Sequence, residues 1–229
     1  MFQGFTPESV QFLWGIRFNN ERSWFEAHKQ DYLLHVQQPL RQLAAQVQEE
    51  VLRRHPKLQL NLHVSRIYRD ARRLHGRGPY KDHMWLVLHR PTQDASGGTS
   101  PAFYFEIAPE YYSIGMGYYS ATPLTMAKLR ARMDRDPKPM EKLARTIARN
   151  PDFRLEGEMY RRPKGSKGAL LDPWYNRKSI AVSWDRPCEG SLFTPALVGE
   201  IADSVDLLLP LFDYLSTLDA DPEPGKCKK

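Results

Sequence analysis

Only two residues, Pro109-Glu110, separate two runs in the middle of the chain whose composition is typical of β-strands. The first run is Ala102 to Ala108, and the second is Tyr111 to Gly117. A connection this short can join antiparallel neighbours, but it cannot make the long crossover that parallel strands require. The sheet is therefore predicted to be mainly antiparallel, with these two runs as a hairpin.

The first quarter of the chain has a helical period instead. A helix is predicted to start at Thr6-Pro7-Glu8, because Thr can cap free N–H groups and Pro is tolerated at the first helical position. Asn20 is expected to cap a second helix, and apolar residues continue at helical spacing to about Arg54. The same kind of signal predicts further helices at Thr122-Pro123, Asp136-Pro137 and Thr194-Pro195.

Three other runs, at residues 63–69, 84–88 and 179–184, are predicted to be strands. The 229 residues contain no internal repeat and no Gly/Ser linker long enough to separate two domains. The predicted fold class is α+β, with a mainly antiparallel sheet packed against N-terminal, middle and C-terminal helices. A single domain is predicted over residues 1–218, and residues 219–229 are predicted to be a disordered polar tail.

The stretch from Val64 to Trp85, called here the first basic segment, carries six Lys and Arg residues against the acids Asp70 and Asp82. A Gly/Pro turn at residues 76–79 lies between its two strand-like ends. Such a density of cations indicates either a solvated surface or the lining of an anion site. The six cations are Arg66, Arg69, Arg72, Arg73, Arg77 and Lys81.

Two interpretations of this segment stay open. In the first, Asp70 braces whichever of Arg66 and Arg69 is covered, because an unpaired buried guanidinium costs several kcal/mol. In the second, the cations converge on a phosphate or carboxylate, which Arg binds through two parallel hydrogen bonds. The ligand residues would then be Arg66, Arg69, Arg72 and Lys81, with Tyr80 supplying a hydroxyl group or a stacking face.

A second basic segment, at residues 154–178, is predicted to be irregular, and it presents Arg162 and Lys164 in a loop containing Pro and Gly. If the two basic segments meet in space, their like charges require an anion or a carboxylate between them. Glu106 and Asp172 are the candidates for that carboxylate, and they would serve as general base if a reaction is catalysed. The alternative for each, as for Asp70, is an ordinary surface or bracing acid.

The sequence gives little support for other kinds of functional site. It lacks a Walker phosphate loop, a dinucleotide-binding fingerprint, a Gly-x-Ser-x-Gly nucleophile elbow and a paired-Cys motif. The seven His are scattered, and a metal site built from His75, His83, Asp70 and Asp82 is only a minor alternative. No metal and no cofactor are therefore predicted, and whether the protein is an enzyme stays open.

The composition also bears on location. No apolar run approaches the roughly 20 residues that a membrane span requires, and the first ten residues lack the pattern of a secretory signal. Two cysteines, Cys188 and Cys227, are too few for a disulfide framework. The predicted location is the cytoplasm, and no membrane partner is expected.

Five short motifs occur in order along the chain and cover it from Phe2 to about Leu218. They are GF at Gly4-Phe5, NNERSWF at Asn19 to Phe25, RIYRDAR at Arg66 to Arg72, GPYK at Gly78 to Lys81, and RPKG at Arg162 to Gly165. With these motifs the chain resembles the proteins grouped as domain of unknown function 2461, conserved hypothetical proteins of bacteria and fungi. The resemblance implies no assigned activity and therefore supplies no catalytic residues.

The net charge of +6 favours anionic partners. The predicted function is binding of an anionic small molecule in a pocket lined by cations of both basic segments, with or without a reaction. The alternative is a nucleic-acid or protein interaction module, in which sheet tyrosines stack beside the cations. The ligand residues of the first reading are Arg66, Arg69, Arg72, Tyr80, Lys81, Arg162 and Lys164, and the tyrosines of the second are Tyr104, Tyr111, Tyr112, Tyr118 and Tyr119.

Overall fold

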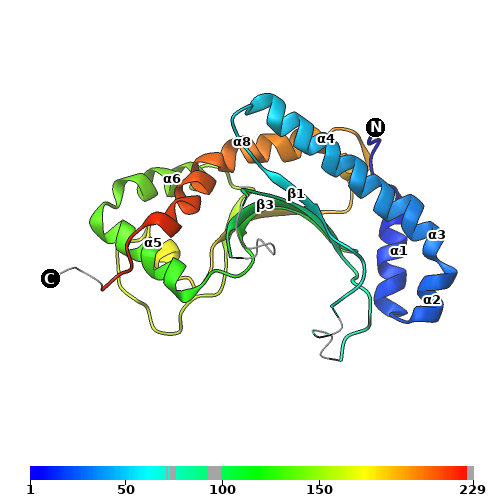
Figure 1. Ribbon diagram of the computed structural model, residues 1–229, viewed down its shortest axis with the longest axis horizontal. Helices are drawn as coiled ribbons and strands as arrows, with labels where there is room; N and C mark the ends of the chain where they lie inside the picture. Colours follow the sequence, from blue (N-terminus) through cyan, green and yellow to red (C-terminus); the bar gives the residue numbers. More distant parts are fainter. Residues whose placement is uncertain (71, 73–75, 92–98, 226–229) are drawn as a thin grey trace. The chain divides into compact units, whose positions relative to one another are not determined.

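The computed structural model describes residues 1–70, 72, 76–91 and 99–225, which form a six-stranded sheet accompanied by helices (Figure 1). The sheet is antiparallel, with the strand order β1-β2-β3-β4-β6-β5, so the predicted α+β class is confirmed. The strands are β1 (Asn61–Val64), β2 (Met84–His89), β3 (Pro101–Ile107), β4 (Tyr111–Tyr118), β5 (Arg154–Glu156) and β6 (Ala181–Pro187).

Helices precede the sheet, interrupt it and follow it. The N-terminal ones are α1 (Pro7–Phe18), α2 (Arg22–Ala27), α3 (Lys29–Asp31), the π-helical segment η1 (Tyr32–Gln37) and α4 (Gln38–Arg54). The later ones are α5 (Pro123–Arg135), α6 (Lys138–Ala148), α7 (Asp172–Tyr175), the 3-10 turns η3 (Gly190–Phe193) and η4 (Leu218–Ala220), and α8 (Leu197–Ser216).

The predicted helix starts depend on short side chains that bond to the backbone of the first turn. Before α1, Ser9 Oγ accepts a hydrogen bond from the Thr6 backbone N–H at 2.9 Å. Before α5, Thr122 Oγ1 accepts from the backbone N–H of Thr125 at 3.0 Å. The prediction for Asn20 is wrong: α2 has Glu21 at its N-cap, and the Asn20 side chain bonds elsewhere.

The chain packs as two compact units. The first unit contains Met1–Leu88, Tyr104–Ile114 and Asp185–Ser204, and the second contains His89–Phe103, Gly115–Trp184 and Val205–Lys229. Strands β3 and β4 and helix α8 therefore contribute residues to both units. The single domain over residues 1–218 and the disordered tail after it stay predictions.

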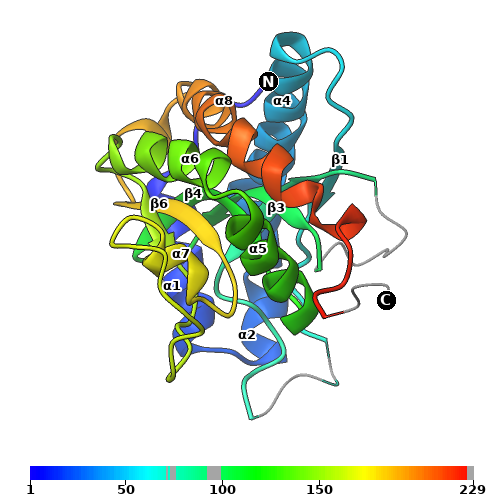
Figure 2. The same ribbon diagram turned by 90° about the vertical axis from the view of Figure 1, so that its left-hand side faces the viewer.

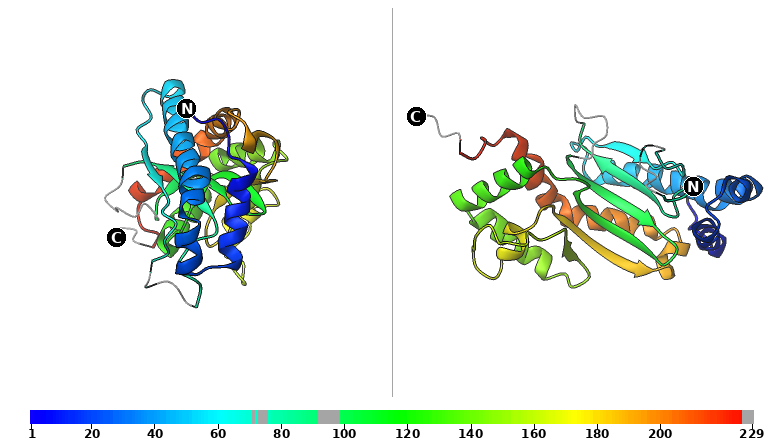
Figure 3. Two further views of the ribbon diagram at one scale, coloured as in Figure 1. Left: turned by 90° about the vertical axis from the view of Figure 1, so that its right-hand side faces the viewer. Right: turned by 90° about the horizontal axis from the view of Figure 1, so that it is seen from below.

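In the first unit, β2 presents every second side chain to the core. Met84, Leu86 and Leu88 are buried along this strand, while the residues between them are only partly covered. Phe105 of β3 stacks on Phe5, with 5.9 Å between the ring centroids. Figure 3 shows the N-terminal helices of this unit lying together, in blue. One face of these strands is thus fully packed, and the other is only partly covered.

In the second unit, α5 and α6 lie beside the C-terminal half of α8 (Figure 2). Phe103 of β3 packs on Phe212 of α8, with ring centroids 4.4 Å apart. The hydroxyl group of Tyr118 donates to the carbonyl oxygen of Leu215 at 3.1 Å. The ammonium of Lys128 on α5 donates to the carbonyl oxygen of Asp219 at 2.7 Å, which ties the segment after α8 to this helix.

Two sequence predictions about strands need correction. The strand expected over residues 63–69 is β1, which ends at Val64, followed by a separate bridge between Tyr68 and Tyr80. The second basic segment, expected to be irregular, contains the short strand β5 and the helix α7, and β5 pairs antiparallel with β6. A strand of three residues is too short to show an alternating pattern.

Candidate functional site

The first basic segment folds back on itself, and this brings Arg66 and Arg69 near Lys81. The backbone N–H of Arg69 donates to the carbonyl oxygen of Pro79 at 2.8 Å, and that of Lys81 donates to Ile67 at 2.7 Å. These bonds flank the bridge between Tyr68 and Tyr80. The turn signal in the sequence therefore marks a real reversal of the chain between the two halves of the segment.

Asn20 holds this reversal to the N-terminal helices. Its Nδ2 donates to the carbonyl oxygen of Tyr80 and its Oδ1 accepts from the Tyr80 backbone N–H, each at 2.9 Å, so the side chain substitutes for a neighbouring strand. A Cβ atom at Gly78 would lie 2.1 Å from Asn20 Oδ1. Glycine is therefore needed at position 78, because any side chain there would push Asn20 away.

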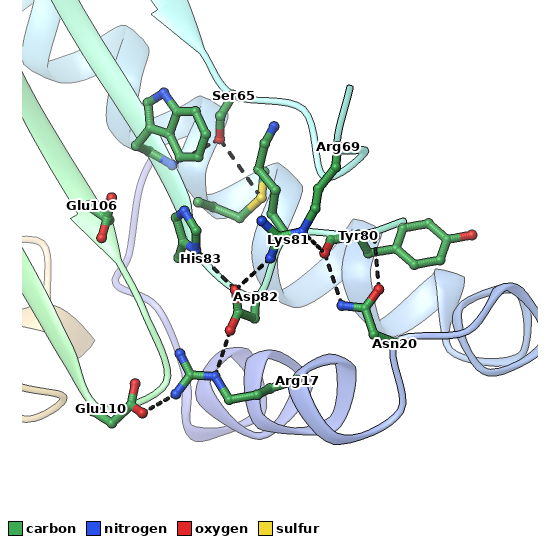
Figure 4. A network of polar contacts seen from close by, with 12 residues as sticks. Arg17, Asn20, Ser65, Arg69, Tyr80, Lys81, Asp82, His83, Glu106 and Glu110 are labelled. Carbon is green, nitrogen blue, oxygen red and sulfur yellow. Dashed lines mark hydrogen bonds and ion pairs between the residues drawn. The ribbon is translucent and has the colours of Figure 1, made fainter. Parts of the chain in front are cut away.

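Asp82 is the centre of a polar cluster at the end of the reversal (Figure 4). Its Oδ2 accepts from Arg17 Nε at 2.6 Å, and its Oδ1 accepts from Arg69 Nη2 at 3.2 Å and bonds to His83 Nδ1 at 3.1 Å. Arg17 on α1 also pairs with Glu110, from the loop between β3 and β4. Four separate segments of the first unit thus meet at one carboxylate network.

Burial by itself raises the pKa of Asp82, but hydrogen bonds from Arg17 and His83 outweigh it, and the net pKa lies below the ordinary value. Burial similarly opposes the charge of Arg17, yet its bonds to Asp82 and Glu110 raise the pKa of the guanidinium. The ion pair is therefore fixed in its charged form at neutral pH.

The covered arginine is Arg69, whose side chain is 14% exposed, but its acid partner is not the predicted one. Its Nε donates to the carbonyl oxygen of Tyr80 at 2.7 Å, and its Nη2 pairs with Asp82. Asp70 pairs instead with the exposed Arg72, at 2.8 Å. The expectation of an Arg69–Asp70 brace is wrong because neighbouring residues of an extended chain point to opposite sides.

Lys81 and Tyr80 have very different surroundings. The Lys81 ammonium donates to the carbonyl oxygen of Arg66 and lies 4.6 Å from the centre of the Trp85 ring. Its pKa is lowered by burial and, next, by the positive charges of Arg69 and Arg66. Tyr80 is buried and stacks on Phe25 with 4.3 Å between centroids, so its ring belongs to the core.

Glu106 is part of the first unit and is engaged by a neighbouring tyrosine. Its Oε1 accepts from the Tyr111 hydroxyl group at 3.1 Å. Burial raises the pKa of Tyr111, and the Glu106 carboxylate raises it further, so the phenol stays protonated. Tyr112 and Tyr118 are buried, which removes both from the set of tyrosines expected to stack on bases.

Arg162, Lys164 and Asp172 belong to the second unit, so the predicted site residues fall into two groups. Both oxygens of Asp172 are used within its own loop: Oδ2 accepts from Ser166 Oγ at 2.9 Å, and Oδ1 accepts from the backbone N–H of Lys167 at 2.5 Å. Arg162 is exposed, and the Lys164 ammonium lies 4.7 Å from the centre of the Tyr160 ring.

Sequence reasoning missed Arg17, Asn20 and Glu110 as members of the cluster. Asp82 was noted only as one of two acids in the first basic segment. The excess of Lys and Arg around it was the feature that could have identified it as an ion-pair partner. Nothing in the sequence marks Arg17, because it lies on a helix 65 positions away from Asp82.

Within residues 1–70, 72, 76–91 and 99–225, three or more His, Cys, Asp or Glu side chains nowhere come together to hold a metal ion. The alternative metal site included His75, which is outside the described residues, so that idea stays a prediction. The helices in the described part of the chain are all too short or too polar to cross a membrane.

These features define an α+β protein with a partly buried carboxylate network beside Arg66, Arg69 and Lys81. The chain belongs to the conserved hypothetical protein family DUF2461, whose model matches residues 8–214, as the order of motifs indicated. No curated protein matches the chain.

Proposed function

We propose that this protein binds a small phosphate- or carboxylate-bearing anion at Lys81, with Arg66 and Arg69 beside it, and that it does so in the cytoplasm. The observation that carries the proposal is the uncompensated positive charge of the Lys81 ammonium. It is partly buried, it feels the positive charges of two guanidinium groups, and no carboxylate among the described residues pairs with it.

The charges around Lys81 are poorly balanced. Asp82 lies closest in sequence, but it already accepts hydrogen bonds from Arg17, Arg69 and His83. The repulsion among Lys81, Arg66 and Arg69 therefore persists in the absence of a ligand, and a bound anion would relieve it. Binding energy from this source favours a charged oxygen ligand over a neutral one.

Arg69 is already oriented for such a role. Tyr80 and Asp82 fix its guanidinium through Nε and Nη2, and a guanidinium has five N–H donors in a rigid plane. The remaining donors can bind an anion with little loss of side-chain entropy, because the side chain is held in advance. Arg72 and Tyr80 drop out of the proposed ligand set, since Arg72 pairs with Asp70 and the Tyr80 ring is in the core.

The test is calorimetric titration of the full chain with inorganic phosphate and with citrate at low ionic strength. Lys81→Met, which keeps the length of the side chain, is expected to weaken binding at least about tenfold. The matched control is Lys57→Met, because Lys57 is exposed and none of the acids in the described ranges pairs with it. Equal affinity in both variants, or no binding by the unaltered protein, would overturn the proposal.

A further inference from the structure

The loop at residues 159–171, called here the basic loop, concentrates positive charge on an exposed part of the second unit, just before α7. It contains four Lys and Arg residues and no Asp or Glu. All four cations are exposed, and they are Arg161, Arg162, Lys164 and Lys167. An exposed surface with charge of a single sign raises the local concentration of partners of the opposite sign.

The acids on either side of the basic loop in the sequence are already engaged. Glu158, before it, pairs with Lys178, and Asp172, near its end, accepts hydrogen bonds from within the loop. Lys167 pairs with Asp134 of α5 at 2.7 Å. No acid among the described residues pairs with the other three cations, so three positive charges within four positions remain uncompensated. They are Arg161, Arg162 and Lys164.

Asn176 fixes the shape of the basic loop, although the loop has no regular structure. Its Oδ1 accepts from the backbone N–H of Lys164 at 2.7 Å, and its Nδ2 donates to the carbonyl oxygen of Gly165 at 3.0 Å. Its own carbonyl oxygen accepts from the backbone N–H of Tyr160 at 2.9 Å. The cations are therefore presented from a backbone that is already ordered, which lowers the entropic cost of binding a partner.

The side chains of the basic loop fit a phosphate backbone better than a protein surface. Guanidinium groups bind phosphate through two parallel hydrogen bonds. Protein interfaces are instead enriched in aromatic residues and depleted of Lys, whereas the one large apolar side chain that this fully described loop exposes is Met159, at 45%. Tyr160 has Lys164 and Arg130 over its ring, so stacking of bases on it is not expected.

We infer that the basic loop binds the phosphate backbone of nucleic acid through Arg161, Arg162 and Lys164, without reading the bases. Such contacts give an affinity that does not depend on sequence. Each cation that neutralises a phosphate releases a counterion, so three contacts give a slope of about −2.7 in log K against log salt concentration. The affinity should therefore fall about fortyfold between about 50 and 200 mM salt. The site at Lys81 has no part in this inference, which uses residues of the second unit alone.

Fluorescence anisotropy of a labelled DNA duplex of about 20 base pairs, titrated with the full chain over this salt range, tests the inference. Changing Arg161, Arg162 and Lys164 together to Gln should weaken binding at about 50 mM salt at least tenfold and bring the slope close to zero. The matched control removes the same charge by changing Lys57, Lys138 and Arg149 to Gln, all exposed and outside the basic loop, and should keep the slope. Equal effects of the two triple variants would show that only net charge matters and would overturn the inference.

A polyglutamate peptide of the same total charge distinguishes nucleic acid from an acidic protein partner. The duplex carries one charge per about 1.7 Å and an extended peptide at most one per about 3.3 Å, so the duplex should bind at least about tenfold more tightly. Equal affinity for the peptide, or no binding of the duplex at about 50 mM salt, would overturn the inference. Lys81→Met should bind the duplex normally. Binding lost in Lys81→Met and kept in the triple variant of the basic loop would assign the duplex to the first unit and overturn the inference as well.

Discussion

Arg17 Nε donates a hydrogen bond of 2.6 Å to Asp82 Oδ2, and the two residues are 65 positions apart in the chain. The side chains are 30% and 18% exposed, so water screens this ion pair only in part. Asp82 also accepts from Arg69, which gives one carboxylate two guanidinium partners. The pair joins α1 to the end of the first basic segment. It also occupies Asp82, which is the nearest acid in sequence to Lys81.

Asp82→Asn should therefore destabilise the protein. The amide keeps the shape of the carboxylate but leaves Arg69 without a counter-charge and Arg17 with Glu110 alone, and we expect a loss of about 2 kcal/mol in the free energy of unfolding. Urea denaturation measures this loss. The matched control is Asp203→Asn, since Asp203 is 72% exposed in its pair with Arg54, and a cost below about 1 kcal/mol is expected there. Equal costs for the two variants would contradict the assignment.

The lowered pKa of Asp82 predicts how stability depends on pH. A carboxyl group whose pKa is lower in the folded than in the unfolded state stabilises the protein above the unfolded value, about 3.9 for Asp. That contribution is lost as the pH falls through the folded pKa. Urea unfolding between about pH 6 and pH 3 should therefore show a shallower acid-induced loss for Asp82→Asn than for the unaltered protein. Parallel curves would show that Asp82 is not a source of the acid sensitivity.

Those parts of the fold that depend on local rules could be predicted from the sequence. Thr122 caps α5 through a residue three positions later, and the gap of three residues between Ile107 and Tyr111 fixes the direction of β4 against β3. Both signals act between near neighbours, so a single sequence contains them in full.

The partners in the candidate site were not predictable in the same way. The choice of Asp82 over Asp70 for Arg69 depends on how the chain reverses and on where α1 packs, and neither is written in local spacing. Asn20 shows the same limit, because its sequence context favours a helix cap while its side chain bonds to the backbone of Tyr80. The excess of Lys and Arg identified the first basic segment as a candidate site. Only the long-range packing shows which of its cations have an acid partner and which do not.

Asn20→Ala should loosen the reversal that carries Arg69 and Lys81. The change removes two hydrogen bonds to the Tyr80 backbone and leaves a part-buried N–H and C=O without them, at an expected cost of about 2 kcal/mol. Asn150→Ala is the control, since Asn150 makes a single side-chain bond, to the carbonyl oxygen of Thr146 at 2.8 Å, and should cost less than about 1 kcal/mol. Thermal unfolding measures both, and amide hydrogen exchange at Arg69 and Lys81 should quicken only in Asn20→Ala.

Lys81 should titrate below the ordinary lysine value of about 10.4, because burial and the charges of Arg69 and Arg66 disfavour its ammonium. With the folded pKa below the unfolded one, the charged Lys81 disfavours the folded state at neutral pH, and this cost disappears as the pH rises through the unfolded value. NMR titration of ¹³C-methylated lysines gives the pKa directly. Arg66→Gln should raise it by removing one neighbouring charge, and saturating inorganic phosphate should raise it by adding an opposite one. If the pKa of Lys81 is the same in Arg66→Gln and in saturating phosphate as in the unaltered protein, the three cations are not coupled. The proposed anion site would then lose its physical basis.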